Sequence, residues 1–345
     1  MRARAALAGA LALMLAPFTA EAGTVRVATW HLALEGTGPG LALRDIERGT
    51  APRLSAIARV IGEVAPDVLV VQGVDYDLGL RALAALRDRI AEDGPHYPHL
   101  FALRPNTGWP TGLDMDGDGR RGGPRDAQGY GAFSGQGGMA ILSRHPLDRA
   151  GARDFSAMPW RDLPGALLPR WPDGRPFPSH AAQAVQRLSS VGHWAVPVRL
   201  PSGPLMLLAF HATTPVFDGE EDRNGRRNHD EIRFWQHYLD GAFGPAPARR
   251  FVLIGDANLD PDRGEGRRGA IRALLSDPRL RDPLAGLATV DWPQTGPLRV
   301  SYALPSADLT VTGAGVHWPP EGAPGRAAAE MAGPHRLVWV DISLP

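Results

Sequence analysis

The sequence predicts an α/β protein in which sheets and helices form layers. Residues 68–71 are a continuous apolar run, Val-Leu-Val-Val, which is typical of a strand covered on both faces. Apolar residues recur at helical spacing between residues 54 and 61, and residues 78–90 repeat that pattern. Together with a short β pattern at residues 25–30, these segments alternate between strand and helix, which favours an α/β layered fold.

The rest of the chain continues with short β patterns, two helices and two long loops. Residues 194–200 and 205–210 flank Pro201-Ser202-Gly203-Pro204, which predicts a hairpin. Residues 104–136 are nearly free of aliphatic side chains and residues 150–190 are rich in proline, so we expect two long loop insertions there. The further elements that we expect are strands at 138–142, 251–254, 300–304, 309–311 and 337–342, and helices at 232–239 and 271–275.

The N-terminus has the features of a signal peptide. Arg2 and Arg4 precede an apolar run over residues 5–16, and Ala20-Glu21-Ala22 follows as a small-x-small cleavage site. The run is too short to cross a bilayer, and the alternative is a buried N-terminal helix. We therefore expect residues 1–22 to be removed and residues 23–345 to form one domain, periplasmic or secreted, without a transmembrane segment.

Composition excludes several classes of protein. The chain has no cysteine, so it is not a disulfide-stapled miniprotein and must be stabilised by a buried core. Without residues 1–22 the chain keeps 35 basic and 36 acidic residues, because two arginines and one glutamate are removed. This balance is unlike the strongly basic surface of a dedicated nucleic-acid-binding protein.

Polar side chains follow four of the predicted strands at the point where each strand ends. His31 follows the first strand, Asp75 lies just past the second, His211 ends a later strand, and Asp256 with Asn258 follows another. Ligands of α/β sheets bind beyond the carboxyl ends of strands, so this repetition predicts one convergent site. The alternative for any single strand is ordinary turn chemistry, since Asp, Asn and Gly form turns.

The order of these segments resembles a known family. The matching segments are Ala-Thr-Trp-His-Leu at 28–32, Pro-Asp-Val-Leu-Val-Val-Gln at 66–72, the strand at 137–144, Ala-Phe-His-Ala-Thr at 209–213, Gly-Asp-Ala-Asn at 255–258, and the segments at 300–306 and 334–338. Gly-Asp-x-Asn is the most specific of them. Together they are similar to the endonuclease/exonuclease/phosphatase family across nearly the whole chain.

The resemblance implies a fold, a reaction and roles for four residues. The fold is a four-layer sandwich of two packed mixed β-sheets flanked by helices. The reaction is hydrolysis of a phosphoester, in a small molecule or a nucleic acid, assisted by Mg²⁺ or Mn²⁺. By this resemblance Asp256 binds metal and orients the attacking water, Asn258 binds a phosphoryl oxygen, and His211 and His335 bond the phosphate.

Four positions depart from the family pattern. They are His31, Gly73, Ser301 and Pro334, which stand where the family has an asparagine, a metal-binding glutamate and two aspartates. One interpretation is a rearranged site, in which Asp75 and Asp77 supply carboxylates and His31 is a ligand or a phosphate contact. The alternative is a catalytically degenerate periplasmic binding or interaction protein on the same fold.

Three further motifs lie outside this pattern. Asn228 and His229 follow the histidine strand closely, so they are candidates for binding substrate, although a capped helix packed on the sheet also explains them. Two acidic segments are candidate Ca²⁺ loops, each with a solvated acidic turn as its alternative. Their candidate ligands are Asp114, Asp116 and Asp118 in the first segment, and Glu220, Asp222, Asn224 and Glu231 in the second.

Overall fold

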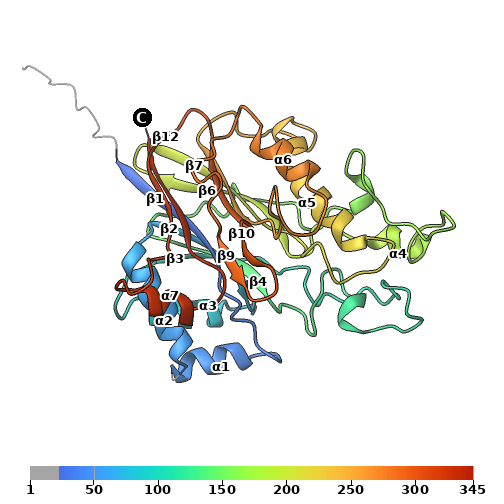
Figure 1. Cartoon of the computed structure of the whole chain (residues 1–345), viewed down its shortest axis with the longest axis horizontal. Helices are drawn as coiled ribbons and strands as arrows, with labels where there is room; N and C mark the ends of the chain where they lie inside the picture. Colours follow the sequence, from blue (N-terminus) through green and yellow to red (C-terminus); the bar gives the residue numbers. More distant parts are fainter. Residues whose placement is uncertain (1–22, 50, 345) are drawn as a thin grey trace, which may run out of the picture.

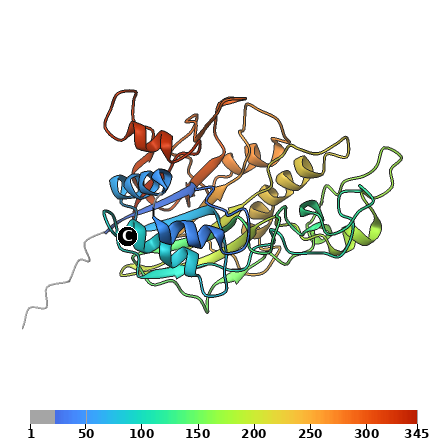
Figure 2. The same ribbon diagram turned by 90° about the horizontal axis from the view of Figure 1, so that it is seen from below.

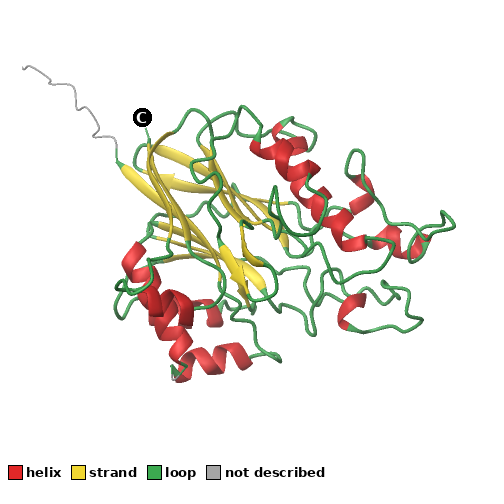
Figure 3. Cartoon of the chain, viewed as in Figure 1, coloured by secondary structure: helices red, strands yellow, loops and turns green. Residues whose placement is uncertain are grey.

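The computed structural model describes residues 23–49 and 51–344, so the segment predicted as a signal peptide lies outside the described residues. Two β-sheets lie face to face, and helices cover the outer side of each sheet (Figure 1 and Figure 3). Strand β1 (Thr24–His31) of one sheet contacts β8 (Phe251–Asp256) and β11 (Ser301–Pro305) of the other. The structure therefore confirms the predicted four-layer sandwich of two mixed sheets.

The first sheet has six strands, with the predicted apolar strand in its interior. That strand, β2, is buried along its whole length because sheet and helices cover its two faces. It pairs in parallel with β1 and antiparallel with β4. In spatial order the strands are β12 (Thr310–Val316), β13 (Val338–Ser343), β1, β2 (Val68–Val74), β4 (Gly138–Ser143) and β3 (His99–Phe101).

The second sheet has five strands, and its side chains alternate between two cores. Along β7, Leu207 and Ala209 join the core between the sheets, whereas Leu208 and Phe210 join the core beneath the outer helices. This alternation follows from the two-residue period of a strand. In spatial order the strands are β11, β8, β7 (Gly203–His211), β6 (Gly192–Leu200) and β5 (Arg153–Asp154).

Helices form the two outer layers. On the first sheet α2 contacts α3 and α7, and on the second sheet α5 contacts α6 (Figure 1). Helix α2 begins with Pro52, whose fixed backbone suits the first turn of a helix, and it buries seven residues against the sheet. The helices are α1 (Leu41–Arg48), α2 (Pro52–Val64), α3 (Arg81–Ile90), α4 (His180–Val185), α5 (Arg223–Leu239), α6 (Gly269–Leu275) and α7 (Arg326–Met331).

The structure differs from the sequence prediction in three respects. Helix α5 begins at Arg223, nine residues before the predicted helix, and helices α1, α4 and α7 were not predicted. A two-stranded hairpin, β9 (Val290–Trp292) with β10 (Gly296–Leu298), was also missed. The two predicted loop insertions project together at one end of the sandwich (Figure 2). Among the described residues, no helix is both long enough and apolar enough to span a membrane.

Candidate active site

The ends of strands from both sheets meet at one edge of the sandwich. His31 ends β1 and pairs with Gln72 of the parallel strand β2. In the second sheet His211 ends β7 and pairs with Asp256 at the end of the parallel strand β8. Ser301 of β11 pairs with Asp256 from the other side. Because parallel strands end at the same edge of a sheet, and because the sheets face each other, these side chains converge.

Three imidazoles surround the buried carboxylate of Asp256. His31 Nδ1 lies 2.8 Å from Asp256 Oδ2, His335 Nδ1 lies 3.9 Å from it, and His211 Nε2 lies 4.0 Å from it. The His31 ring packs against both other imidazoles, with centroid distances of 4.9 Å to His211 and 4.5 Å to His335. The structure thus brings together the strand-end histidines His31 and His211, His335 from the segment before β13, and the acidic residue of the Gly-Asp-x-Asn segment.

Burial fixes the protonation of this cluster. Burial lowers the pKa of His211 to about 4 and that of His335 to about 3, so both imidazoles are neutral at pH 7. For Asp256, burial alone would raise the pKa, but the hydrogen bond with His31 and the neighbouring imidazoles outweigh it and hold the pKa below its usual range. The site therefore presents an ionised carboxylate beside the neutral imidazoles of His211 and His335.

Gly73 makes room for His31. A Cβ atom at residue 73 would lie 2.8 Å from both Cδ2 and Nε2 of the His31 ring, and 2.7 Å from the backbone nitrogen of Ala33. The residue also has a φ of +68°, which favours glycine, and it sits at an irregularity in the pairing of β2 with β4. The replacements at positions 31 and 73 are therefore coupled, because the imidazole occupies the space that a side chain at 73 would need.

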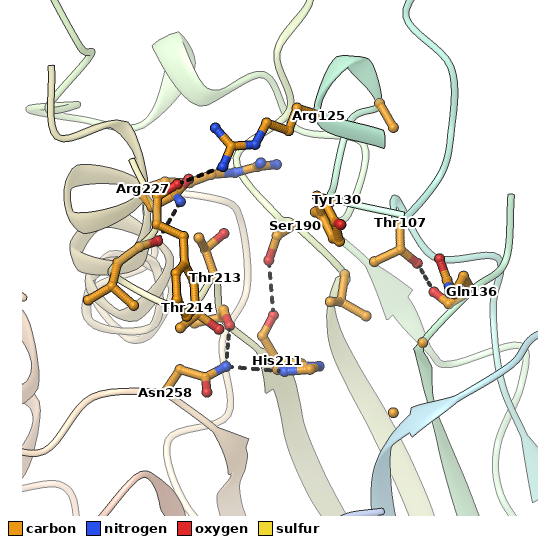
Figure 4. A pocket seen from close by; sticks show the side chains of 18 of the residues that line it. Thr107, Arg125, Tyr130, Gln136, Ser190, His211, Thr213, Thr214, Arg227 and Asn258 are labelled. Carbon is orange, nitrogen blue, oxygen red and sulfur yellow. Dashed lines mark hydrogen bonds between the residues drawn. The ribbon is translucent and has the colours of Figure 1, made fainter. Parts of the chain in front are cut away.

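The Gly-Asp-x-Asn segment forms a tight turn that orients Asp256. A Cβ at Gly255 would lie 2.0 Å from the carbonyl oxygen of Phe210, so the neighbouring strands approach closely only with glycine there. The backbone nitrogen of Asn258 donates to Asp256 Oδ1 at 2.9 Å, which leaves Oδ2 facing the histidines. The Asn258 side-chain amide donates to the Ala212 carbonyl at 2.9 Å and lies 3.3 Å from His211 Nε2 (Figure 4).

A cavity of about 610 Å³ opens above this cluster. His31, His211 and Asn258 line it, and Figure 4 shows Arg125 and Arg227 on the side away from Asn258. Polar and aromatic side chains from the loops complete the lining, and sequence reasoning did not assign them to the site because only the folded loops bring them there. They include Thr213, Thr214, Arg125, Tyr130, Ser190 and Glu35.

The structure does not bring Asp75 and Asp77 to the histidine cluster. The two carboxylate oxygens of Asp75 accept hydrogen bonds from the backbone nitrogens of Gly36 at 2.9 Å and Gly137 at 3.0 Å. Asp77 accepts from the backbone nitrogens of Arg81 and Ala82 in the first turn of α3. Both carboxylates are thus engaged in holding loops and a helix terminus, and neither fills the place of the missing glutamate.

Asn228 and His229 also lie outside the cavity lining. Asn228 is fully buried and donates to the carbonyl oxygens of Thr213 and Ala257, so it braces the segments that follow β7 and β8. His229 bonds Asp230 at 2.9 Å and faces α6, where a Cβ on Gly269 would lie 3.6 Å from its Nε2. Both positions match the packing alternative rather than direct contact with a ligand in this cavity.

The first acidic segment gathers part of the predicted calcium ligands. Carboxylate oxygens of Asp114, Asp116 and Asp126 lie within 4.8 Å of one another. Asp118 is not in that group, and its side chain accepts a hydrogen bond from the backbone nitrogen of Arg120 at 2.7 Å. Calcium at this loop stays a prediction.

The second acidic segment does not form an EF-hand-type loop in the structure. Asn224 and Glu231 both lie within α5, so the segment is not the open twelve-residue loop that an EF-hand needs. Glu231 is fully buried and accepts hydrogen bonds from the backbone nitrogen and hydroxyl of Ser190 and from the backbone nitrogen of Thr213. Glu220 and Asp222 lie before the helix, and Asp222 pairs with Arg267.

Comparisons of the sequence and of the structure with known proteins point to the same family. The model of the endonuclease/exonuclease/phosphatase family matches residues 44–337. An endonuclease/exonuclease/phosphatase from Beutenbergia cavernae superposes with a TM-score of 0.56 at 20% identity, covering 93% of this chain and 72% of that one. A family protein from Leptotrichia buccalis superposes with a TM-score of 0.56 at 15% identity, covering 93% of this chain and 100% of that one. Sphingomyelinase C from Streptomyces griseocarneus superposes with a TM-score of 0.50 at 16% identity, covering 92% of this chain and 99% of that one. No curated protein matches the sequence, and at these identities the structural likeness shows the fold alone.

Proposed function

The chain belongs to the endonuclease/exonuclease/phosphatase family, and from this premise we propose that it is an exported, metal-dependent hydrolase of phosphoester bonds. One observation carries the proposal. An ionised carboxylate, Asp256, lies among three imidazoles, and two of these, His31 and His211, line a cavity whose lining also includes arginine and threonine side chains. Perturbed titratable groups beside a polar cavity are typical of an active site.

The cavity lining suits a phosphoryl group. Arg125 is exposed at the cavity, and a guanidinium matches the geometry and charge of phosphoryl oxygens. The hydroxyl of Thr213 is buried and has no hydrogen-bond partner among the described residues, so it is free to donate to a ligand. Asn258, beside His211, adds an amide donor near the carboxylate. These groups would bind and orient the phosphoester above Asp256.

Charge is the reason for proposing metal dependence. A phosphoester is an anion, and Asp256 is a buried anion, so the two repel each other when the substrate enters the cavity. A divalent cation between them would remove that repulsion and neutralise charge on the phosphoryl oxygens. The residues present, however, do not suit Mg²⁺, which prefers an octahedral set of oxygen ligands. Here imidazole nitrogens surround the single central carboxylate.

The proposal of export rests on the N-terminal sequence. Arg2 and Arg4, the apolar run over residues 5–16 and the small residues Ala20 and Ala22 have the order of a secretory signal. Expression in a bacterial host followed by N-terminal sequencing of the periplasmic fraction tests this, with Gly23 as the expected first residue. An unprocessed N-terminus at Met1 would contradict export.

Hydrolysis by matched aspartate variants tests the activity. The substrates are bis-p-nitrophenyl phosphate, p-nitrophenyl phosphate and plasmid DNA, each with EDTA, Mg²⁺, Mn²⁺, Ca²⁺ or Zn²⁺. We expect turnover with at least one cation and none with EDTA. Asp256→Asn keeps the size of the side chain but removes its charge, so it should lower kcat/KM by at least about 100-fold. Asp77→Asn, which changes an aspartate outside the cluster, should keep the wild-type rate.

The binding-protein alternative makes the opposite prediction. A degenerate site would take up a phosphoester without cleaving it, so no cation would support turnover of any of the three substrates. Equal rates for wild type and Asp256→Asn would also contradict the proposal, because the activity would then belong to a contaminant or to another site.

A further inference from the structure

The potential metal ligands around Asp256 are imidazole nitrogens, whereas a magnesium site is built from oxygen ligands. We propose that His31, His211 and Asp256 bind one zinc-class transition metal ion, with His335 as a further nitrogen donor. Imidazole nitrogens suit Zn²⁺ and its neighbours in the first transition series, whereas Mg²⁺ prefers carboxylate, carbonyl and water oxygens. This inference deepens the proposed function, because it names the cation of the same site, but metal binding can be measured without turnover.

The spacing of the ligand atoms fits a small ion. Ligand atoms of His31, His211 and Asp256 all lie within 4.8 Å of one another. A tetrahedral zinc site with bonds near 2.0–2.1 Å places its ligand atoms roughly 3.4 Å apart. The distances of 2.8 Å from His31 Nδ1 to Asp256 Oδ2 and of 4.0 Å from His211 Nε2 to the same oxygen bracket that value. The longer distances must therefore shorten, by up to about 1.4 Å from the 4.8 Å limit, for these three ligands to reach tetrahedral spacing.

Unpartnered nitrogen atoms point to a missing ligand. His335 is only 6% exposed, and its Nδ1 atom lies 3.9 Å from Asp256 Oδ2 without a hydrogen-bond partner among the described residues. The Nδ1 atom of His211 also lacks a partner among them, but Nε2 is the nitrogen of His211 that faces Asp256. Buried polar atoms without partners are costly, so their presence beside a carboxylate needs an explanation. A bound cation would satisfy the Nδ1 atom of His335.

The surroundings hold the ligands in place. The backbone nitrogen of Asn258 donates to Asp256 Oδ1, which fixes the carboxylate with Oδ2 toward the imidazoles. Trp292 of the β9–β10 hairpin packs edge-on against His335, with a centroid distance of 5.3 Å. His31 and His211 both line the cavity, so a cation held between them would be accessible to a ligand in it.

The same geometry explains why the departures from the family pattern occur together. Gly73, Ser301 and Pro334 remove three oxygen-bearing side chains that the family resemblance leads one to expect, and His31 adds a nitrogen donor. The absence of a side chain at Gly73 is what lets the His31 ring lie beside Asp256. Three oxygen-bearing side chains are thus absent and one imidazole is added, which favours ions that bind nitrogen over Mg²⁺.

Metal titration of matched histidine variants tests the inference. The full-length gene is expressed, and the protein is purified without a histidine tag, stripped with a chelator and titrated calorimetrically with Zn²⁺ and with Mg²⁺. We expect one tightly bound Zn²⁺ per chain and no Mg²⁺ binding at this site. Co²⁺ should bind with the visible absorption bands of a four-coordinate or five-coordinate ion.

The variants separate this site from adventitious surface binding. His31→Ala should weaken Zn²⁺ binding by more than about 100-fold, because loss of even an outer partner of a metal ligand costs up to that factor. His96→Ala is the matched control, since His96 is exposed and far in sequence from the cluster, and it should bind like wild type. Circular dichroism checks folding, and His335→Gln provides a second variant if His31→Ala is unfolded.

Each outcome decides between the two proposals. No Zn²⁺ binding, or Zn²⁺ binding that neither His31→Ala nor His335→Gln weakens, overturns the metal assignment. Hydrolysis that Mg²⁺ supports in a protein that binds no Zn²⁺ overturns this inference and leaves the proposed function standing. Zn²⁺ bound through His31 without hydrolysis of any phosphoester supports the metal assignment and counts against the proposed function.

Discussion

Replacing Gly73 with alanine tests whether the empty space at that residue positions His31. The new Cβ would lie 2.8 Å from the His31 ring and 2.7 Å from the backbone nitrogen of Ala33, and contacts this short do not occur without movement. The backbone nitrogen cannot rotate away, so the strand end and the His31 ring must shift. We expect Gly73→Ala to destabilise the fold and to separate His31 from Asp256.

The magnitude of the effect follows from two contributions. Gly73 has a φ of +68°, and a side chain in the left-handed region costs roughly 1–2 kcal/mol. Overpacking against His31 and Ala33 adds roughly 1–3 kcal/mol. The free energy of unfolding should therefore fall by roughly 2–5 kcal/mol in total.

A second glycine isolates the contact from the backbone cost. Gly165 has a φ of +73°, but a Cβ there would meet no atom within 4 Å. Gly165→Ala therefore carries the left-handed cost without the collision, and the difference between the two variants should be roughly 1–3 kcal/mol. Urea unfolding followed by tryptophan fluorescence measures both, with Zn²⁺ affinity as a second measurement. Equal unfolding free energies for the two variants would refute the claim that Gly73 makes room for His31.

Two further predictions concern the frame around the site. Burial lowers the pKa of His193 to about 4, so the unfolded chain binds a proton below pH 6.5 that the folded chain does not. The free energy of unfolding should therefore fall by up to about 3 kcal/mol as the pH drops from 6.5 to 4. Urea unfolding of His193→Gln should show a shallower fall than wild type. The same pH dependence in both proteins would contradict this role of His193. Asp77→Ala should lower the unfolding free energy by about 1 kcal/mol, because the Asp77 carboxylate accepts hydrogen bonds from backbone nitrogens in the first turn of α3. An unchanged melting curve would show that the cap contributes nothing.

Hydrophobic periodicity was enough to predict most of the fold. The apolar run that became β2 is buried on both faces, and the alternation along β7 divides its side chains between two cores. Periodicity failed at the start of α5, because Arg227, Asn228 and Glu231 are polar residues on the buried face of that helix. Their hydrogen bonds to distant backbone groups satisfy them, and those partners cannot be found from local sequence.

The sequence by itself also determined which residues reach the site from three of the four strand ends, since polar residues after buried strands share one edge of a sheet. Only the tertiary structure decided how those residues meet. His31 and Asp256 are 225 positions apart and come from different sheets, so their contact depends on how the sheets pack. Likewise, Asp77 is near the site in sequence but caps α3, because the direction of a side chain is set by the local backbone and not by its distance along the chain. Only the tertiary structure shows that the His31 ring fills the space that a side chain at residue 73 would need, which places an imidazole nitrogen beside Asp256.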